Sequence, residues 1–343
     1  MANLRANKLV GIGSTDAGVV FDGPIKINTQ GVMYFPTGDT DYRGNNNGRG
    51  IFAGGGTPTT ATIDYMKLNA TPVVALDFGD LTESKRYAGG CGSAIRGIIY
   101  GGYVSNSVNT IEYITIATLG NGTDFGDQTV ARHGGACFSN STRGIYVAGY
   151  SNTTSANTNV IGYITIATTG NETDFGDSAN ILRYFGGCSS TTRGIWGGGN
   201  DNSPGYTDTI EFVEIATTGN GVDFGNLAAA QRGGTACSSN IRGVFSGGYT
   251  PTLLNTIQYV NIASTGNALD FGDLEYVSNE WWNPCAASSQ LRGYIAGGYG
   301  PAKDNHVQTI TIATSGNSHD FGELLINGGD GVAATSDCHG GLS

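Results

Sequence analysis

The tripeptide Asp-Phe-Gly recurs along this chain at nearly equal intervals. Its six phenylalanines are Phe78, Phe125, Phe175, Phe224, Phe271 and Phe321. The intervals between them are 47, 50, 49, 47 and 50 residues. Self-similarity at this period is typical of propellers and solenoids. One copy could belong to a kinase metal loop, but six copies without a glycine-rich phosphate loop or a His-Arg-Asp motif exclude that interpretation.

The copy at 143–192 shows how one repeat is built. It contains a short apolar run that ends in glycine (143–150), an alternating β-branched run (161–166), the Asp-Phe-Gly segment (174–177) and a run of small residues (186–190). These patterns predict strands, and no helical periodicity is present. We name the small-residue strand a, the Arg-Gly strand b, the alternating strand c and the Asp-Phe-Gly strand d. Four short strands in about 50 residues are the size of one propeller blade.

The order of the strands predicts how the ring closes. The first strand b starts at Arg49 with no strand a before it, and one more strand a follows Phe321, around Cys338. We expect that last strand to pair with the first blade near Ile51, which removes the exposed sheet edges. The sequence therefore predicts an all-β fold, a six-bladed propeller of four-stranded antiparallel blades over 49–343, with a short N-terminal extension over 1–48.

Three features of the repeat resemble the kelch repeat. They are an arginine before strand a, a Gly-Gly pair after strand b, and an aromatic residue in strand d, where kelch has tryptophan and this chain has phenylalanine. The arginines are Arg86, Arg132, Arg183 and Arg232. The fuller string at 109–127 is similar to the glycine-rich, kelch-like repeats in virion structural proteins of tailed bacteriophages, especially marine ones. The resemblance covers about 49–343 and implies a kelch-like propeller in a phage particle.

The charge and hydropathy of the chain argue against two classes of partner. The net charge is −11, and nucleic acids and anionic membranes attract basic surfaces instead. No stretch approaches the roughly 20 apolar residues of a membrane span, so we expect no membrane insertion. The first residues show no cleavable secretion signal, and synthesis in the host cytoplasm is expected.

Six cysteines occur once per repeat, 12 to 17 residues after the phenylalanine of strand d. They are Cys91, Cys137, Cys188, Cys237, Cys285 and Cys338. We interpret them as one repeat position that holds a small buried thiol, because free cysteine is among the most buried residue types. A ring of thiols that binds metal is the alternative, but no Cys-x-x-Cys pair supports it. No metal site and no cofactor are expected.

Other repeated side chains are expected to build structure. An arginine starts each strand b (Arg49, Arg96, Arg143, Arg193, Arg242 and Arg292), and an aspartate precedes each strand-d phenylalanine. They suggest ion pairs or arginine-to-backbone bonds within or between blades. Tyrosines after strand b (Tyr103, Tyr150, Tyr249 and Tyr299) are expected to pack. No nucleophile elbow, His-x-x-x-His or paired-acid motif appears, so no catalytic residue is predicted.

Loop lengths differ between the two faces of the expected disc. The a–b and c–d turns are nearly uniform, whereas the b–c and d–a connections vary, and variable loops on a rigid scaffold concentrate binding residues. One candidate is Glu280-Trp281-Trp282-Asn283, since tryptophans stack on sugars or anchor interfaces; the alternative is that one tryptophan fills the channel. The other is the loop 200–206 with Asp201 and Tyr206, which could hold a cation or be a solvated turn.

The first 48 residues break the period. Two short strand-like segments carry Ile25 and Ile27, and Val32 and Tyr34. We expect an attachment arm that binds other virion proteins; the alternative is a strand pair packed on the edge of the disc. Deletion of 1–40 separates the two.

These observations favour a non-enzymatic virion structural protein displayed on the exterior of a phage particle. It would mediate adhesion to a host-surface glycan or receptor, or decorate the capsid, neck or tail. The alternative is a glycan-processing enzyme, sialidase-like or lyase-like, on a propeller scaffold. A cytosolic scaffold, as many kelch proteins are, is a third possibility, although no partner domain accompanies the repeats.

Overall fold

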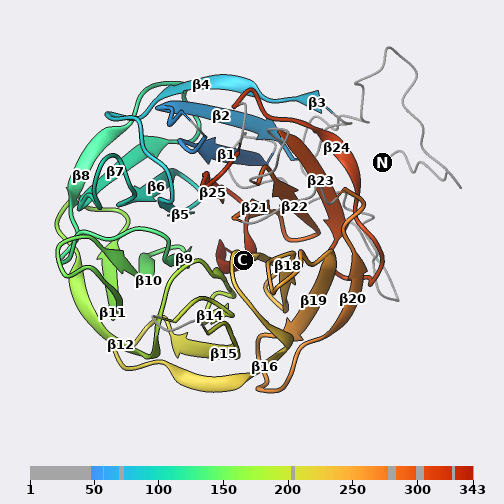
Figure 1. Cartoon of the computed structure of the whole chain (residues 1–343). Coiled ribbons are helices and arrows are strands. Elements are labelled where there is room, and N and C mark those ends of the chain that lie inside the picture. Colours follow the sequence, from blue (N-terminus) through green and yellow to red (C-terminus); the bar gives the residue numbers. More distant parts are fainter. Residues whose placement is uncertain are drawn as a thin grey trace, which may run out of the picture. The chain divides into compact units, whose positions relative to one another are not determined.

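The predicted ring of six blades is present. The computed structural model describes residues 48–56, 58–68, 73–201, 205–276, 283–298, 305–326 and 329–342. In this part of the chain, six antiparallel sheets surround a central axis (Figure 1). Within the described ranges no helix has the length and apolar character needed to cross a lipid bilayer. Ile25, Ile27, Val32 and Tyr34 of the predicted arm lie outside the described residues, so the arm stays a prediction.

Every blade has the spatial order a, b, c, d from the axis outward. Blade 1 consists of β25 (Ala333–Ser336), β1 (Arg49–Ala53), β2 (Thr62–Lys67) and β4 (Leu76–Asp80). Blade 2 consists of β5 (Gly89–Gly92), β6 (Arg96–Tyr100), β7 (Thr110–Thr115) and β8 (Thr123–Asp127). Blade 3 consists of β9 (Ala136–Ser139), β10 (Arg143–Ser151), β11 (Ala156–Thr165) and β12 (Thr173–Leu182).

Blades 4 to 6 repeat the arrangement. Blade 4 consists of β13 (Gly186–Ser189), β14 (Arg193–Gly197), β15 (Thr207–Glu214) and β16 (Val222–Gln231). Blade 5 consists of β17 (Thr235–Ser238), β18 (Arg242–Ser246), β19 (Thr256–Asn261) and β20 (Leu269–Asp273). Blade 6 consists of β21 (Cys285–Ser288), β22 (Arg292–Ala296), β23 (His306–Thr311) and β24 (His319–Glu323).

The C-terminal part of the chain closes the ring, as predicted. β25 pairs antiparallel with β1, and Thr335 lies opposite Ile51. The closing strand ends at Ser336, so Cys338 follows it and does not lie within it. The chain then forms a short 3-10 turn, η1 (Gly340–Leu342). Joining the last strand to the first blade pairs the inner edge of β1 and gives blade 1 the same four strands as the other blades.

One strand was not predicted. β3 (Val73–Val74) lies in the c–d connection of blade 1 and pairs parallel with β24 of blade 6. This connection is the one that is a residue longer than its counterparts, 15 residues from Ile63 to Phe78 against 14 from Ile111 to Phe125. Blade 6 therefore has a fifth strand on its outer edge.

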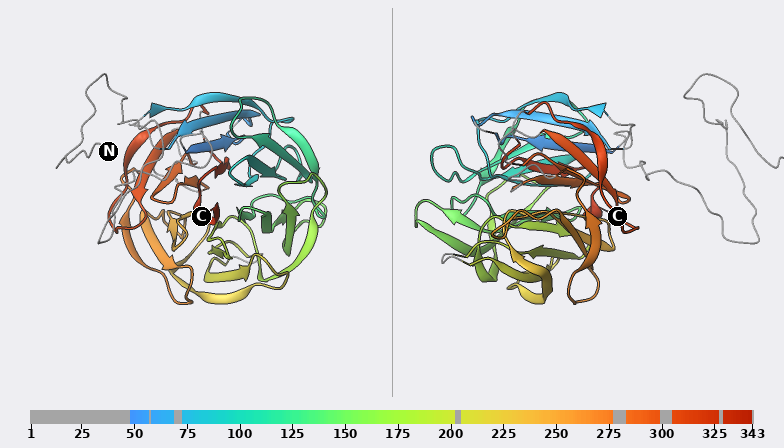
Figure 2. Two further views of the ribbon diagram at one scale, coloured as in Figure 1. Left: turned by 180° about the vertical axis from the view of Figure 1, so that it is seen from behind. Right: turned by 45° about the vertical axis from the view of Figure 1, so that its right-hand side comes forward.

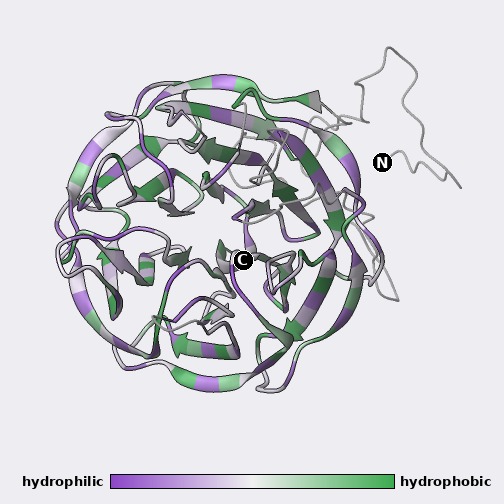
Figure 3. Cartoon of the chain, viewed as in Figure 1, coloured by the Kyte–Doolittle hydropathy of each residue, from purple (hydrophilic) through white to green (hydrophobic). Residues whose placement is uncertain are grey.

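The apolar core lies between neighbouring blades. Strands b are almost entirely buried, and in β7, the strand c of blade 2, Ile111, Glu112 and Ile114 are buried while Thr115 is exposed. Figure 3 shows hydrophobic and hydrophilic residues as green and purple bands along the strands. One cluster joins Ile51 and Ile63 of blade 1 to Ile99 and Ile114 of blade 2. Because each cluster uses residues from two blades, no blade buries its core alone.

The cysteines do not share one repeat position, which corrects the sequence-based interpretation. Cys91, Cys188 and Cys237 occupy the third residue of strand a. Cys137 is the second residue of β9 and Cys285 the first residue of β21. Cys137 stands one residue earlier in its strand although its d–a connection has the usual length, whereas the connection before Cys285 is three residues longer than those of blades 2 to 5. All six thiols are free, and four of them are buried as expected.

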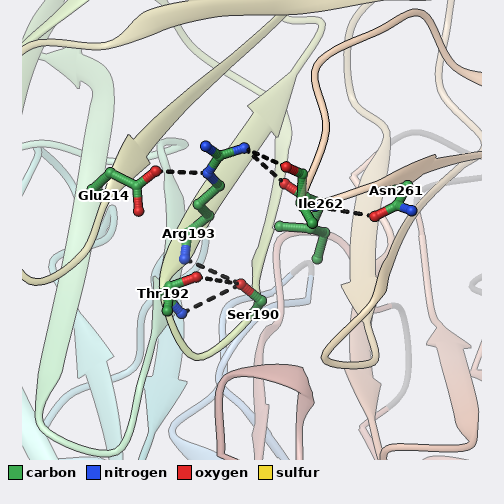
Figure 4. Close-up of polar contacts among 7 residues, drawn as sticks. Ser190, Thr192, Arg193, Glu214, Asn261 and Ile262 are labelled. Atoms are coloured by element: carbon green, nitrogen blue, oxygen red, sulfur yellow. Dashed lines mark hydrogen bonds and ion pairs between the residues drawn. The ribbon is translucent and has the colours of Figure 1, made fainter.

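The arginines that start strands b join each blade to the next. Arg193 Nη1 donates to Ile262 O at 3.3 Å and to Ala263 O at 3.0 Å, across the gap between blades 4 and 5 (Figure 4). Its guanidinium lies 4.7 Å from the ring of Phe212 and pairs with Glu214 at 2.6 Å. Arg49, Arg96, Arg143 and Arg242 make corresponding bonds to the following blade. The expected arginine-to-backbone bonds are therefore confirmed for these five residues.

We expect loss of one such arginine to weaken the interface between two blades. Arg96 Nη1 donates to Ile166 O and Ala167 O at 3.0 Å each, and its guanidinium lies 4.7 Å from Tyr113. Arg96→Ala should lower the free energy of unfolding by about 1.5–3 kcal/mol, since charge-assisted bonds are lost. Urea denaturation measures this. Lys67→Ala, at an exposed site, should cost less than about 0.5 kcal/mol; equal losses for both variants would contradict the interpretation.

Candidate functional site

Six residues form a hydrogen-bonded ring around one end of the central channel. They stand just before strand a, one per blade, and all have positive φ: Tyr87 (57°), Gly134 (67°), Tyr184 (57°), Gly233 (68°), Asn283 (56°) and Gly331 (69°). The amide of each donates to the carbonyl of its counterpart in the preceding blade, at 2.6 to 3.4 Å. We call this the mouth ring. A closed circle of six backbone bonds gives the mouth a fixed diameter.

Two tyrosines in the mouth ring adopt a backbone conformation that disfavours them. A bulky residue at positive φ is uncommon and costs about 1 kcal/mol or more relative to glycine. Glycine does occupy the neighbouring positions, and it makes room for the rings. A Cβ on Gly134 would come within 2.8 Å of the Tyr184 ring, and one on Gly331 within 2.4 Å of Tyr87. The two tyrosine rings meet edge to face at 5.3 Å. Strained residues of this kind concentrate at functional sites.

A cavity of about 120 Å³ opens inside the mouth ring. Tyr87, Tyr184, Phe185 and Thr235 line it, together with glycines and alanines of strands a. A volume of this order holds a group about the size of benzene. The cavity therefore suits one small ring or substituent and excludes a folded protein segment.

The C-terminal segment covers the opposite end of the channel. His339 lines a second cavity of about 50 Å³ and places Nε2 2.9 Å from Gly92 O. Gln290 Nε2 donates to the carbonyl of His339 at 2.8 Å, and Leu342 is buried. Burial lowers the pKa of His339 to about 4, so this imidazole is neutral at pH 7. In the right-hand view of Figure 2 the C-terminus and the b–c loops of blades 2 and 3 lie on opposite sides of the disc.

Polar side chains, four of them charged, stand immediately before the mouth ring. The residues at this position are Arg86, His133, Arg183, Arg232 and Asp330. Arg132 was assigned to this position from the sequence, and that assignment is wrong. It lies one residue earlier, where it forms a buried ion pair with Glu172 at 2.6 Å. His133 stands at the position that Arg86, Arg183 and Arg232 occupy in their blades, eight residues after the strand-d phenylalanine.

Tyrosines hold the three arginines in place. Each guanidinium lies over two aromatic rings. Tyr103, Tyr206 and Tyr249 come from b–c loops, and Tyr150 lies near the end of β10. The pairs are Arg86 with Tyr87 (4.9 Å) and Tyr103 (5.7 Å), Arg183 with Tyr150 (4.8 Å) and Tyr184 (5.2 Å), and Arg232 with Tyr206 (5.3 Å) and Tyr249 (5.4 Å). The expected packing role is confirmed for Tyr103, Tyr150 and Tyr249, while Tyr299 lies outside the described residues. We call these arginines and tyrosines, with His133 and Asp330, the rim.

Two of the rim arginines are linked through their tyrosines. Arg86 lies over the Tyr87 ring, Arg183 lies over the Tyr184 ring, and these two rings meet at 5.3 Å. Burial is the main cause that raises the pKa of Tyr184; Arg183, Arg86 and Arg232 oppose the shift and Asp330 adds to it.

Asp330 is the carboxylate of the rim. It is buried, accepts a hydrogen bond from the Tyr87 hydroxyl at 2.8 Å, and lies 3.4 Å from Arg86 Nη1. Burial raises its pKa, while the bond from Tyr87 and the charge of Arg86 lower it. The carboxylate thus neutralises one of the three arginine charges.

His133 is a neutral part of the rim. Its ring stacks on Tyr87 at 5.9 Å, meets Tyr103 at 5.1 Å, and places Nδ1 2.9 Å from Ser107 Oγ. Burial, together with Arg183 and Arg86, lowers its pKa to about 4. Ser107 Oγ also lies within hydrogen-bonding distance of Tyr150 O and of Asn152, which ties it into the loop structure.

The predicted binding residues are partly placed at this site. Asn283 belongs to the mouth ring and Tyr206 to the rim. Glu280, Trp281 and Trp282 lie outside the described residues. Asp201 is exposed, and its carboxylate accepts a bond from Gly205 N at 3.2 Å. Among the described side chains no group of three His, Cys, Asp or Glu residues is placed to hold a metal ion.

Sequence reasoning missed Tyr87, Tyr184 and Asp330. One signal was available in the sequence. At the mouth-ring position, blades 2 to 5 carry tyrosine and glycine in turn, and blade 6 carries Asn283. Neither a scan of protein-family models nor a search of curated proteins gives a match to this chain. The rim can form hydrogen bonds to an anionic group and stack on a ring, which are binding functions.

Proposed function

We propose that this protein is a non-enzymatic virion structural protein whose propeller attaches a phage particle to the host surface. One observation carries the proposal: a rim of arginine and tyrosine side chains surrounds a small cavity on the face with variable loops. The other face has nearly uniform turns and carries the C-terminal segment that covers the channel. Aromatic rings with hydrogen-bonding groups around a shallow cavity suit a glycan.

The particle context rests on the sequence. The repeat string at 109–127 is similar to kelch-like repeats of phage virion proteins, which supports display on the particle exterior after synthesis in the host cytoplasm. Residues 1–48 would bind other virion proteins. Decoration of the capsid, neck or tail by the same propeller is compatible with this arrangement. Deletion of 1–40 should abolish incorporation into particles while the isolated propeller stays folded.

A glycan-processing enzyme is the second candidate, and Asp330 is the observation that favours it. An acid beside Tyr87 and Arg86 at a cavity could act in proton transfer. Most glycoside hydrolases use two carboxyl groups about 5–10 Å apart, whereas sialidases use a tyrosine nucleophile. The described part of the rim contains one carboxyl group, and Arg86 engages its charge. Burial and the charge of Asp330 raise the pKa of Tyr87, which disfavours the phenolate that a tyrosine nucleophile needs. We therefore favour binding without turnover.

A glycan array combined with a product assay separates the two candidates. We expect the purified protein to retain a subset of host-surface glycans and to release no product over hours. Asp330→Asn should leave bound glycans intact and unchanged in structure. Release of product by the parent protein, and its loss in Asp330→Asn, would establish the enzyme instead.

A further inference from the structure

The composition of the rim specifies the chemistry of the ligand more closely. Resting on the proposed function, we infer that the channel mouth binds the terminal sugar of an acidic glycan through that sugar's carboxylate. The occupant is a single carboxylated pyranose, of the hexuronate or nonulosonate class. Three independent features of the mouth lead to this ligand.

The first feature is local charge. The chain has a net charge of −11, yet Arg86, Arg183 and Arg232 all stand immediately before the mouth ring, in three of the six blades. Asp330 offsets one of these charges through its contact with Arg86. Positive charge concentrated in an acidic protein attracts an anion to that point, and arginine forks match carboxylates with two parallel bonds.

The second feature is the aromatic support of the charge. Every one of these guanidinium groups lies 4.8 to 5.7 Å from two tyrosine rings. This arrangement restricts the side-chain freedom of the arginines before a ligand arrives, which lowers the entropic cost of binding. Tyr87 and Tyr184 add ring faces and hydroxyls beside the cavity, at positions where glycine would be less strained. A sugar has both an apolar face to stack and hydroxyls to pair with such groups.

The third feature is the closed channel. The cavity of about 120 Å³ opens at the mouth ring, and His339 with the C-terminal turn covers the other end. A polysaccharide chain cannot thread through a channel that is covered at one end. The ligand therefore enters end-on, and its terminal residue is the one that reaches the arginines.

The test compares acidic and neutral ligands on the unmodified protein. Oligosaccharides that end in glucuronate, galacturonate or N-acetylneuraminate are measured by titration calorimetry beside their carboxyl-reduced counterparts and sulfated analogues. We expect at least one carboxylated sugar to bind at least tenfold more tightly than its reduced counterpart, with affinity falling as salt rises. Equal affinity for the neutral partner overturns the inference but leaves the proposed glycan adhesion standing. Preference for sulfate overturns the carboxylate assignment, and binding of no glycan overturns both proposals.

Three variants locate the site. Arg183→Gln should weaken binding of the carboxylated sugar at least tenfold. Tyr184→Gly should weaken it similarly without unfolding the protein, because glycine occupies the same ring position in three other blades, at Gly134, Gly233 and Gly331. Lys67→Gln removes an equal charge at an exposed site on strand c and should leave affinity unchanged. Unchanged binding in both mouth variants, with the fold retained, would place the ligand elsewhere.

Discussion

Removal of residues 329–343 is expected to abolish cooperative folding of the propeller. β25 supplies the inner strand of blade 1, with Ala333 opposite Ala53 and Ser336 opposite Gly50. Val332 packs in a cluster with blade 6, and Ala333 packs in a cluster with blade 2. The deleted segment therefore joins three blades at once. We expect a loss comparable with the roughly 5–15 kcal/mol that keeps a domain folded.

A chain of serine hydrogen bonds makes this closure cooperative. In five blades the last residue of strand a is a serine. Its hydroxyl donates to the backbone carbonyl of the last strand-a residue in the preceding blade. These serines are Ser139, Ser189, Ser238, Ser288 and Ser336. Gly92 of blade 2 stands at the equivalent position and has no hydroxyl. This series of hydrogen bonds thus runs from blade 2 around the ring to blade 1, and Ser336 donates the last bond.

Circular dichroism and urea denaturation measure the effect. The truncated chain should lose its sharp transition, and a synthetic peptide of residues 329–343 added in excess should restore it, since the peptide can supply the missing strand in trans. A peptide with proline in place of Thr335 should not, because Thr335 lies opposite Ile51 in a hydrogen-bonded pair, two residues from the bond of Asp337 N to Arg49 O, and proline cannot donate to the ladder. A truncated chain that unfolds with the midpoint of the full protein would contradict a stabilising role for closure.

Repetition made the fold predictable. Strands a to d recur in every blade in the predicted order, because turns and alternating residues are local signals that six copies reinforce. Strand ends were less predictable. The segment 174–177 becomes β12 (Thr173–Leu182), since Thr158 and Leu182 continue the pairing beyond an irregularity in the register. β3 was missed because two valines pair with a strand about 250 residues away in sequence, and no local pattern encodes such a contact.

The binding site was less predictable than the fold. Arg86, Arg183 and Asp330 come from different repeats, and only the closed ring brings them to the channel mouth. Alignment on cysteines also placed the d–a connections out of register, which hid the position shared by Arg86 and His133. A positive φ at tyrosine leaves no signal in the sequence by itself. The variable face could be predicted from loop lengths, whereas the residues on it could not.

Blades 2 and 3 each have a buried cation at the same repeat position, but they pair it with a glutamate from different parts of the repeat. In blade 2, Glu112 on β7 pairs with Lys85 at 2.6 Å and accepts a bond from Thr82 N at 2.8 Å. In blade 3, strand c has Gly162 at the matching position, and Glu172 of the c–d turn pairs with Arg132 at 2.6 Å. The vacated turn position in blade 2 is Gly122. The carboxylate and the glycine have exchanged places, while the ion pair has kept its position.

The exchange predicts a large loss and its rescue. Glu172→Gly should lower the free energy of unfolding by about 3–5 kcal/mol, because Arg132 is left as a buried charge without its carboxylate. Adding Gly162→Glu should restore most of this loss, since a Cβ on Gly162 would point into the space of the Glu172 carboxylate, 2.0 Å from Oε1. The double variant then has the arrangement of blade 2, with glutamate on strand c and glycine in the turn.

Chemical denaturation of the two single variants and the double variant forms a double-mutant cycle that measures this coupling. Gly162→Glu alone should also destabilise, because two carboxylates would then compete for one cavity beside a single arginine. Each single variant should therefore lower the free energy of unfolding, whereas the interaction energy between the two substitutions should be stabilising. Additive losses would show that a glutamate at position 162 cannot replace the carboxylate of Glu172. A loss below about 1 kcal/mol for Glu172→Gly would show that the buried arginine finds another partner.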